Sequence, residues 1–148
     1  MEVDVVTEIE IARSRPEVAS YAADPDNATS WYRNIKRVEW KSPKPLQVGS
    51  RVAFVAQFLG RTIAYTYEIK ELLPNTRLVM ATAEGPFAME TTYEWSDTPA
   101  GTKMTLRNRG TPSGFSKVAA PMMVSAMRRA NTKDLARLKQ ICEALPTG

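Results

Sequence analysis

The fold is decided by PMMVSAMRRANTKDLARLKQICEAL, residues 121–145, in which mostly apolar side chains recur at steps of three and four. This spacing places them on one face of an α-helix. The stripe consists of Val124, Met127, Asn131, Leu135, Leu138, Cys142 and Leu145. The helical pattern extends back to Phe115, and we expect Pro121 either to begin the main helix or to bend it. A helix of about 30 residues spans about 45 Å, which is long enough to cover a sheet.

The chain before this helix consists of short, regularly spaced runs that alternate between apolar and polar residues, as β-strands do. The expected strands are 3–12, 35–41, 51–59, 62–72, 77–83, 87–95 and 102–110, with Gly60-Arg61 as a hairpin turn. Ser14 and Glu17 form a capping-box pattern that predicts a short helix, and Asp24 precedes a second one. No helical pattern separates the later strands, so the sheet should be antiparallel. We therefore expect one α+β domain over residues 1–148.

Period-two alternation assigns most strand residues to one of two faces. The expected inward set is Val38, Trp40, Ile63, Tyr65, Tyr67, Ile69, Leu78, Met80, Thr82, Phe87, Met89, Thr91, Tyr93, Trp95, Met104, Leu106 and Asn108. The charged residues of these strands have the opposite parity. Strand 51–59 is ambiguous, since both of its faces carry apolar residues. A sheet curled around the last helix would enclose an apolar space with a few hydrogen-bonding groups, which is typical of a small-molecule site.

Candidate ligand-binding residues come from both walls of this space. They are Tyr65, Tyr67, Met80, Met89, Thr91, Tyr93, Met104 and Asn108 from the strands, and Phe115, Met123, Met127 and Asn131 from the helical region. Methionine adapts to variable contents, and a buried amide such as Asn131 costs about 1–3 kcal/mol without a partner. Two alternatives stay open: the Tyr and Thr hydroxyls can bond to nearby backbone, and the methionines can simply fill gaps.

The composition bears on several classes of function. The chain has no histidine and one cysteine, so it can form neither a Cys/His zinc site nor an internal disulfide, and we expect no metal and no cofactor. The net charge of +4 is scattered among acidic residues, which indicates a solvated surface rather than a nucleic-acid site. The sequence MEVDVV lacks signal-peptide features, and no apolar run is long enough to insert stably in a membrane. We expect a cytoplasmic monomer or homodimer.

Three motifs carry a family resemblance. The segments are SRPEVASYAADPDNATSWY at 14–32, LPNTRLV at 73–79 and DLARLK at 134–139. Together with the element order over residues 3–145, they resemble the polyketide cyclase/dehydrase and lipid-transport family of the START-like, birch-pollen-allergen-like superfamily. The resemblance implies a helix-grip fold: a seven-stranded antiparallel sheet curved around a long C-terminal helix, with two short helices after strand 1. It also implies a hydrophobic cavity but no universal catalytic motif.

Three functions are compatible with these patterns. The first is binding or carriage of a small hydrophobic ligand, such as a lipid, polyketide or quinone-like molecule, through a mouth formed by 115–127, 59–62 and 84–87. The second is a polyketide cyclase or dehydratase that uses the neutral polar residues Tyr65, Tyr67, Tyr93 and Asn131. Asp134 is then the one carboxylate placed to reach inside, and the otherwise charge-free interior argues against an enzyme. The third is a protein-interaction or membrane-docking module built on the apolar and basic start of the helix.

Overall fold

Seven antiparallel strands form one sheet in the computed structural model, which describes residues 2–85, 88–112 and 118–146. The strands are β1 (Val3–Ile11), β2 (Ile35–Trp40), β3 (Arg51–Phe58), β4 (Arg61–Leu73), β5 (Arg77–Glu84), β6 (Ala88–Thr98) and β7 (Gly101–Thr111). Their order is β1-β7-β6-β5-β4-β3-β2, so every neighbour is consecutive in the chain except β1, which pairs with β7. The predicted α+β class and antiparallel sheet are confirmed.

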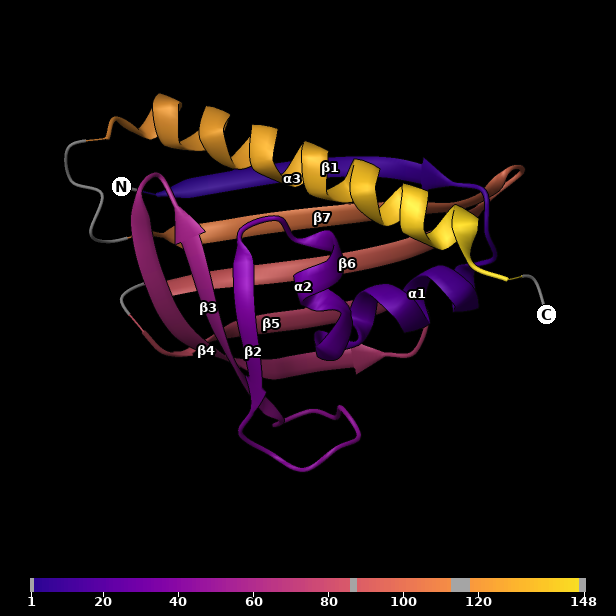
Figure 1. The fold of residues 1–148 in the computed structure, drawn as a ribbon, viewed down its shortest axis with the longest axis horizontal. Helices are drawn as coiled ribbons and strands as arrows, with labels where there is room; N and C mark the ends of the chain where they lie inside the picture. The colour runs from indigo at the N-terminus through magenta and orange to yellow at the C-terminus, as the bar shows by residue number, and fades with distance from the viewer. Residues whose placement is uncertain (1, 86–87, 113–117, 147–148) are drawn as a thin grey trace.

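Helices cover one face of this sheet (Figure 1). They are α1 (Arg15–Ala23), the 3-10 helix η1 (Pro25–Asn27), α2 (Ala28–Trp31) and the long α3 (Ala120–Ala144), which lies along β1. Half of the predicted capping box forms: the Glu17 backbone N–H donates to Ser14 Oγ, but the Glu17 carboxylate accepts from the Ser14 hydroxyl instead of the Ser14 backbone N–H. Asp24 caps η1 by accepting from the Asp26 N–H at 3.0 Å. Both short helices lie where the sequence predicts them.

Proline begins the long helix and does not bend it. Pro121 lies in the first turn of α3, where its missing N–H would have no intrahelical partner in any case. The described helix starts at Ala120, later than the pattern from Phe115 suggests, and residues 113–117 lie outside the described part of the chain.

The inward faces agree with the predicted alternation in the middle of the strands, where Glu68, Glu90 and Arg109 lie on the opposite face. At the strand ends two charged residues depart from it: Arg61 lies beside residues of α3, and Asp97 pairs with Arg15 of α1.

The structure also shows which face of β3, ambiguous in the sequence, points inward: Val52, Phe54 and Ala56 are buried. Phe54 pairs with Tyr65, which fixes its side chain on the helix-covered face. The hairpin turn is Leu59-Gly60, one residue earlier than predicted, because Phe58 pairs with Arg61. Both turn residues have positive φ, as this tight turn requires.

The C-terminal half of α3 closes the core. Leu135, Leu138 and Cys142 are almost completely buried and pack in one cluster with Trp31 and Trp95. Fully burying one such aliphatic side chain contributes about 1.5–3 kcal/mol to folding. This cluster joins α1, α2, α3 and the sheet, so it fixes the position of the helix on the strands.

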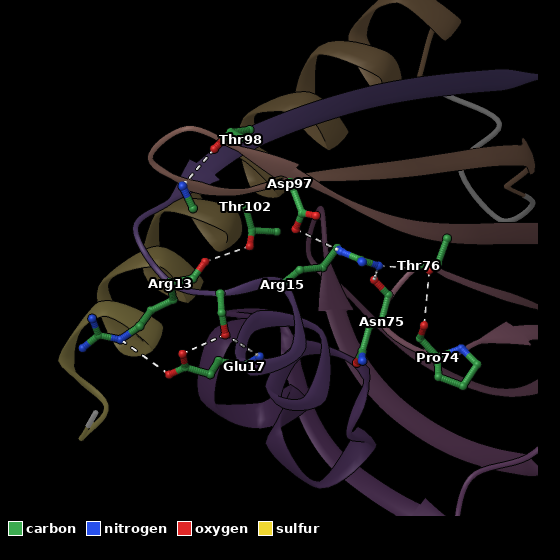
Figure 2. A network of polar contacts seen from close by, with 11 residues as sticks. Arg13, Arg15, Glu17, Pro74, Asn75, Thr76, Asp97, Thr98 and Thr102 are labelled. Atoms are coloured by element: carbon green, nitrogen blue, oxygen red, sulfur yellow. Dashed lines mark hydrogen bonds and ion pairs between the residues drawn. The ribbon is translucent and has the colours of Figure 1, made fainter. Parts of the chain in front are cut away.

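An arginine holds the end of α3. Arg13, in the connection from β1 to α1, donates from Nη2 to the carbonyl oxygens of Glu143 and Leu145 at 2.7 and 2.8 Å. Its own carbonyl accepts from the Thr102 hydroxyl at 2.8 Å, and its guanidinium also faces the Glu17 carboxylate (Figure 2). The last carbonyls of a helix lack intrahelical donors, and a cation there complements the helix dipole. Arg13 therefore links the first strand, β7 and the last helix.

Replacing Arg13 with methionine should lower the free energy of unfolding by about 2 kcal/mol, because two charge-assisted hydrogen bonds to the helix end are lost. Chemical denaturation monitored by circular dichroism measures this change. The matched control is Arg37→Met, since Arg37 is exposed on β2 and has no polar partner among the described residues. The control should change stability by less than about 0.5 kcal/mol. Equal effects of the two substitutions would contradict this role.

Candidate functional site

A cavity of about 180 Å³ lies between the sheet and the helices. Its walls come from the end of α1, the region of α2, strands β2 to β7 and residues 123–134 of α3. Most of the lining side chains are apolar or aromatic, and they include Ile35, Phe54, Ile63, Leu78, Met80 and Met123. Apolar walls with a few polar groups are typical of sites for small molecules.

Most predicted site residues lie around this cavity. Those that line it are Tyr65, Tyr67, Met80, Met89, Thr91, Tyr93, Asn108, Met123, Met127 and Asn131. Met104 does not line it: this side chain is fully buried in the closed core, next to Trp95 in the strand register. Phe115 lies outside the described residues.

The methionines at the start of α3 differ in their surroundings. Met123 is 1% exposed and lines the cavity together with the half-buried Met127, whereas Met122 is 65% exposed. These side chains therefore do not form one surface patch. This arrangement favours a cavity wall over an interaction surface.

Several lining residues were missed in the sequence. Tyr32 follows α2, and Phe54, Ala56 and Phe58 come from β3. The alternation of Val52, Phe54, Ala56 and Phe58 was a usable signal. It was obscured because Ala53 and Val55 make the outer face of the strand apolar as well.

A polar chain crosses the sheet wall of the cavity. The Thr91 hydroxyl donates to Asn108 Oδ1 at 2.7 Å, and its oxygen lies 2.9 Å from the Tyr67 hydroxyl. Thr91 has one proton, which it donates to Asn108, so the Tyr67 hydroxyl donates to Thr91. The oxygen of Tyr67 therefore keeps its capacity to accept a hydrogen bond from a cavity guest.

Two further tyrosines join α2 to the sheet. The hydroxyl oxygens of Tyr32 and Tyr93 lie 2.5 Å apart, and either can be the donor. Burial raises the pKa of both phenols well above the ordinary value of 10, and it raises that of Tyr65 in the same way. These side chains are therefore neutral hydrogen-bonding groups at neutral pH rather than phenolate bases.

Asp134 carries a buried carboxylate to the cavity wall. It is 4% exposed, and its Oδ1 accepts from the Arg33 backbone N–H at 3.1 Å. Burial raises the pKa of this carboxyl group from 3.8 to about 6, and the hydrogen bond from Arg33 partly opposes that shift. The other acidic lining residue, Asp24, is exposed and caps η1. Asp134 is thus the buried group that can exchange a proton near neutral pH.

Asn131 presents an unsatisfied donor. Its side chain is 7% exposed and lines the cavity one turn before Asp134, but its Nδ2 has no hydrogen-bond partner among the described residues. A buried donor without a partner costs about 1–3 kcal/mol. An acceptor inside the cavity would remove this cost.

The described ranges 2–85, 88–112 and 118–146 lack two further features. No helix there combines the length and the apolar character that crossing a membrane requires. No group of three or more Cys, Asp or Glu side chains there is placed to hold a metal ion.

Comparison with known sequences identifies the family. A family model described as polyketide cyclase / dehydrase and lipid transport matches residues 2–143. The chain belongs to the polyketide cyclase/dehydrase and lipid transport family. The predicted resemblance is therefore confirmed, and binding of hydrophobic small molecules is characteristic of this family. No curated protein sequence matches the chain significantly.

Solved structures share the fold of this family member. The protein TTHA0849 from Thermus thermophilus superposes with a TM-score of 0.83 at 18% identity, over 98% of this chain and 100% of that one. The Zhui aromatase/cyclase from Streptomyces sp. R1128 gives a TM-score of 0.79 at 16% identity, over 97% and 94%. At these identities the likeness establishes the helix-grip fold.

Asp134→Asn should make the protein more stable at neutral pH. The folded state holds the Asp134 proton up to about pH 6, whereas the unfolded chain releases it near 3.8. The contribution of Asp134 to the free energy of unfolding is therefore most favourable at low pH, and it decreases as the pH rises from about 3.8 to about 6. Relative to wild type, the variant should gain about 2 kcal/mol between about pH 4.5 and pH 7. Denaturation at several pH values measures the difference, and a constant difference would contradict the raised pKa.

Proposed function

We propose that the protein binds and carries a small hydrophobic molecule in the cavity between its sheet and α3. The observation that carries the proposal is the lining itself, which is largely apolar and includes a buried amide donor without a partner. The family description, polyketide cyclase / dehydrase and lipid transport, supports the same class of ligand. A lipid, polyketide or quinone-like molecule fits these features.

The lining indicates some chemical features of the ligand. Met80, Met89, Met123 and Met127 form flexible parts of the wall, which suits molecules of variable shape. The unpaired Nδ2 of Asn131 would donate to a carbonyl or hydroxyl oxygen of the ligand. We therefore expect an apolar molecule that carries at least one oxygen acceptor.

We propose that this carrier acts in the cytoplasm. Its one cysteine, Cys142, is free and fully buried, and burial raises the pKa of this thiol to about 11. A protected free thiol suits a reducing compartment.

Met127→Trp should strongly weaken ligand uptake. The larger ring would occupy the cavity that Met127 lines, and so it would compete with any guest. Titration with the neutral fluorophore N-phenyl-1-naphthylamine measures uptake, and we expect its affinity to fall by about tenfold or more. The matched control is Met122→Trp, because Met122 lies on the same helix but is 65% exposed. Unchanged binding in a folded Met127→Trp protein would exclude the start of α3 from the site.

Mass spectrometry tests the proposal without a chosen probe. The protein is purified gently, its native mass is recorded, and bound molecules are extracted into organic solvent. A retained apolar compound that is absent from Met127→Trp would support the carrier function. If wild type and Met127→Trp retain the same compound, that compound is bound outside the cavity.

A polyketide cyclase or dehydratase is the second candidate, and Asp134 is the observation that favours it. A carboxyl group with a pKa of about 6 can both give and accept a proton near neutral pH. The neutral hydroxyls of Tyr65, Tyr67 and Tyr93, together with Asn131, would position a carbonyl substrate beside it.

Asp134→Asn separates the two candidates. If the protein is an enzyme, this variant should lose about 100-fold or more in kcat on a poly-β-ketone substrate, because its general acid–base group is gone. Product formation is followed by chromatography, with Met127→Trp as a control for access to the cavity. Turnover that survives in Asp134→Asn would overturn the catalytic role of this carboxylate.

A further inference from the structure

A second recess adjoins the cavity and has a different character. This groove, of about 530 Å³, lies between the β3–β4 hairpin, the residues after α2 and one face of α3. Polar side chains such as Gln57 and Thr62 line it beside the apolar Leu59 and Ala126. Asn34, Phe58, Ala130 and Asp134 line both spaces, so the cavity and the groove share a wall. Residues 59–62, predicted as part of a mouth, belong to this groove.

The groove is strongly basic. Arg33, Arg61, Arg129 and Lys133 line it and are exposed, whereas Asp134 is its only acidic lining residue in the described part of the chain. The four cations come from three separate segments: the residues after α2, the start of β4 and the middle of α3. The fold, rather than a local run of basic residues, therefore gathers this charge.

Several basic residues on the outer face of the sheet are paired. Arg107 pairs with Asp4, Arg109 with Glu90, and Arg51 with Glu68. Each of these three cations faces a carboxylate on a neighbouring strand. Their charge is thus locally neutralised and offers little attraction to an anion.

The cations on the groove side of α3 lack such partners. Arg129 and Lys133 are four residues apart and therefore neighbours on the helix surface, and like charges at this spacing repel. Neither of them forms an ion pair with any described residue, whereas the Arg33 guanidinium interacts at longer range with the Asp134 carboxylate. An anion bound between them would relieve this repulsion.

We infer that the ligand is an anionic amphiphile, with its apolar part in the cavity and its carboxylate, sulfate, sulfonate or phosphate end in the groove. The inference rests on the proposed function, because it adds a second subsite to the same ligand. An anion would be costly to place in the apolar cavity, where it would lose its hydration. In the exposed groove the anion remains hydrated and is attracted by the basic side chains. The shared wall allows one molecule to occupy both spaces.

The test compares two probes with the same chain and different ends. Decane-1-sulfonate keeps its negative charge at all working pH values, and 1-decanol is neutral. Each is titrated below its aggregation limit as a competitor of N-phenyl-1-naphthylamine, at low and at high salt. The groove variant is Arg129→Gln/Lys133→Gln, and the control is Arg128→Gln/Arg37→Gln, which removes the same charge from exposed positions outside the groove.

Wild type should bind the sulfonate about tenfold more tightly than the alcohol, and salt should reduce this preference. The groove variant should lose about tenfold in sulfonate affinity while its decanol affinity stays within about twofold. The control should retain the preference. Equal binding of the two probes by wild type, or equal losses in both variants, would overturn the anionic subsite while leaving the hydrophobic carrier intact. If neither probe displaces the fluorophore, the carrier function fails, and this inference fails with it.

Discussion

The packing of the C-terminal half of α3 against the sheet is the constraint on which the cavity depends. Leu135, Leu138 and Cys142 are buried with Trp31 and Trp95, and Arg13 ties down the helix end. With that half fixed, the first half of the same rigid helix must extend over the strands at a set height. Met123, Met127 and Asn131 line the space beneath it, together with Tyr65, Tyr67 and Tyr93 of the sheet. The closed core and the cavity therefore lie toward opposite ends of one helix.

Local patterns were sufficient for the elements, because alternation and capping residues act over a few positions. The limits of the cavity were harder to predict, since they depend on where the helix crosses the strands. Met104 and Met80 have the same inward parity, yet the first lies in closed core and the second lines the cavity. Tyr32 could not be predicted as a lining residue from local patterns, because its hydroxyl contacts that of Tyr93, which is distant in sequence. The basic residues are scattered in the sequence, which predicts an ordinary solvated surface. Only the fold brings the β3–β4 hairpin next to α3 and so places these residues around one groove.

Polarity is graded along the binding region. The deepest polar groups are neutral: hydroxyls that are satisfied by one another on the sheet side and an unpaired amide on the helix side. Asp134 lies at the wall shared with the groove, and the four basic residues of the groove lie beyond it. A molecule aligned with this gradient would have one defined orientation. Orientation of that kind serves a carrier that must present the same end at each delivery, and it equally serves an enzyme that must present one carbonyl.

The pairing of β1 with β7 has a consequence for biosynthesis. The Thr7 hydroxyl donates to the carbonyl oxygen of Leu106, which is 99 positions away. Within the described sheet, β1 pairs with β7 alone. During translation, the first strand therefore leaves the ribosome long before its partner exists, with Val3, Val5 and Ile11 still uncovered. Such non-local pairing slows folding, and until it forms the unpaired strand edges are prone to aggregation. The nascent chain should thus depend on chaperone shielding more than its small size suggests.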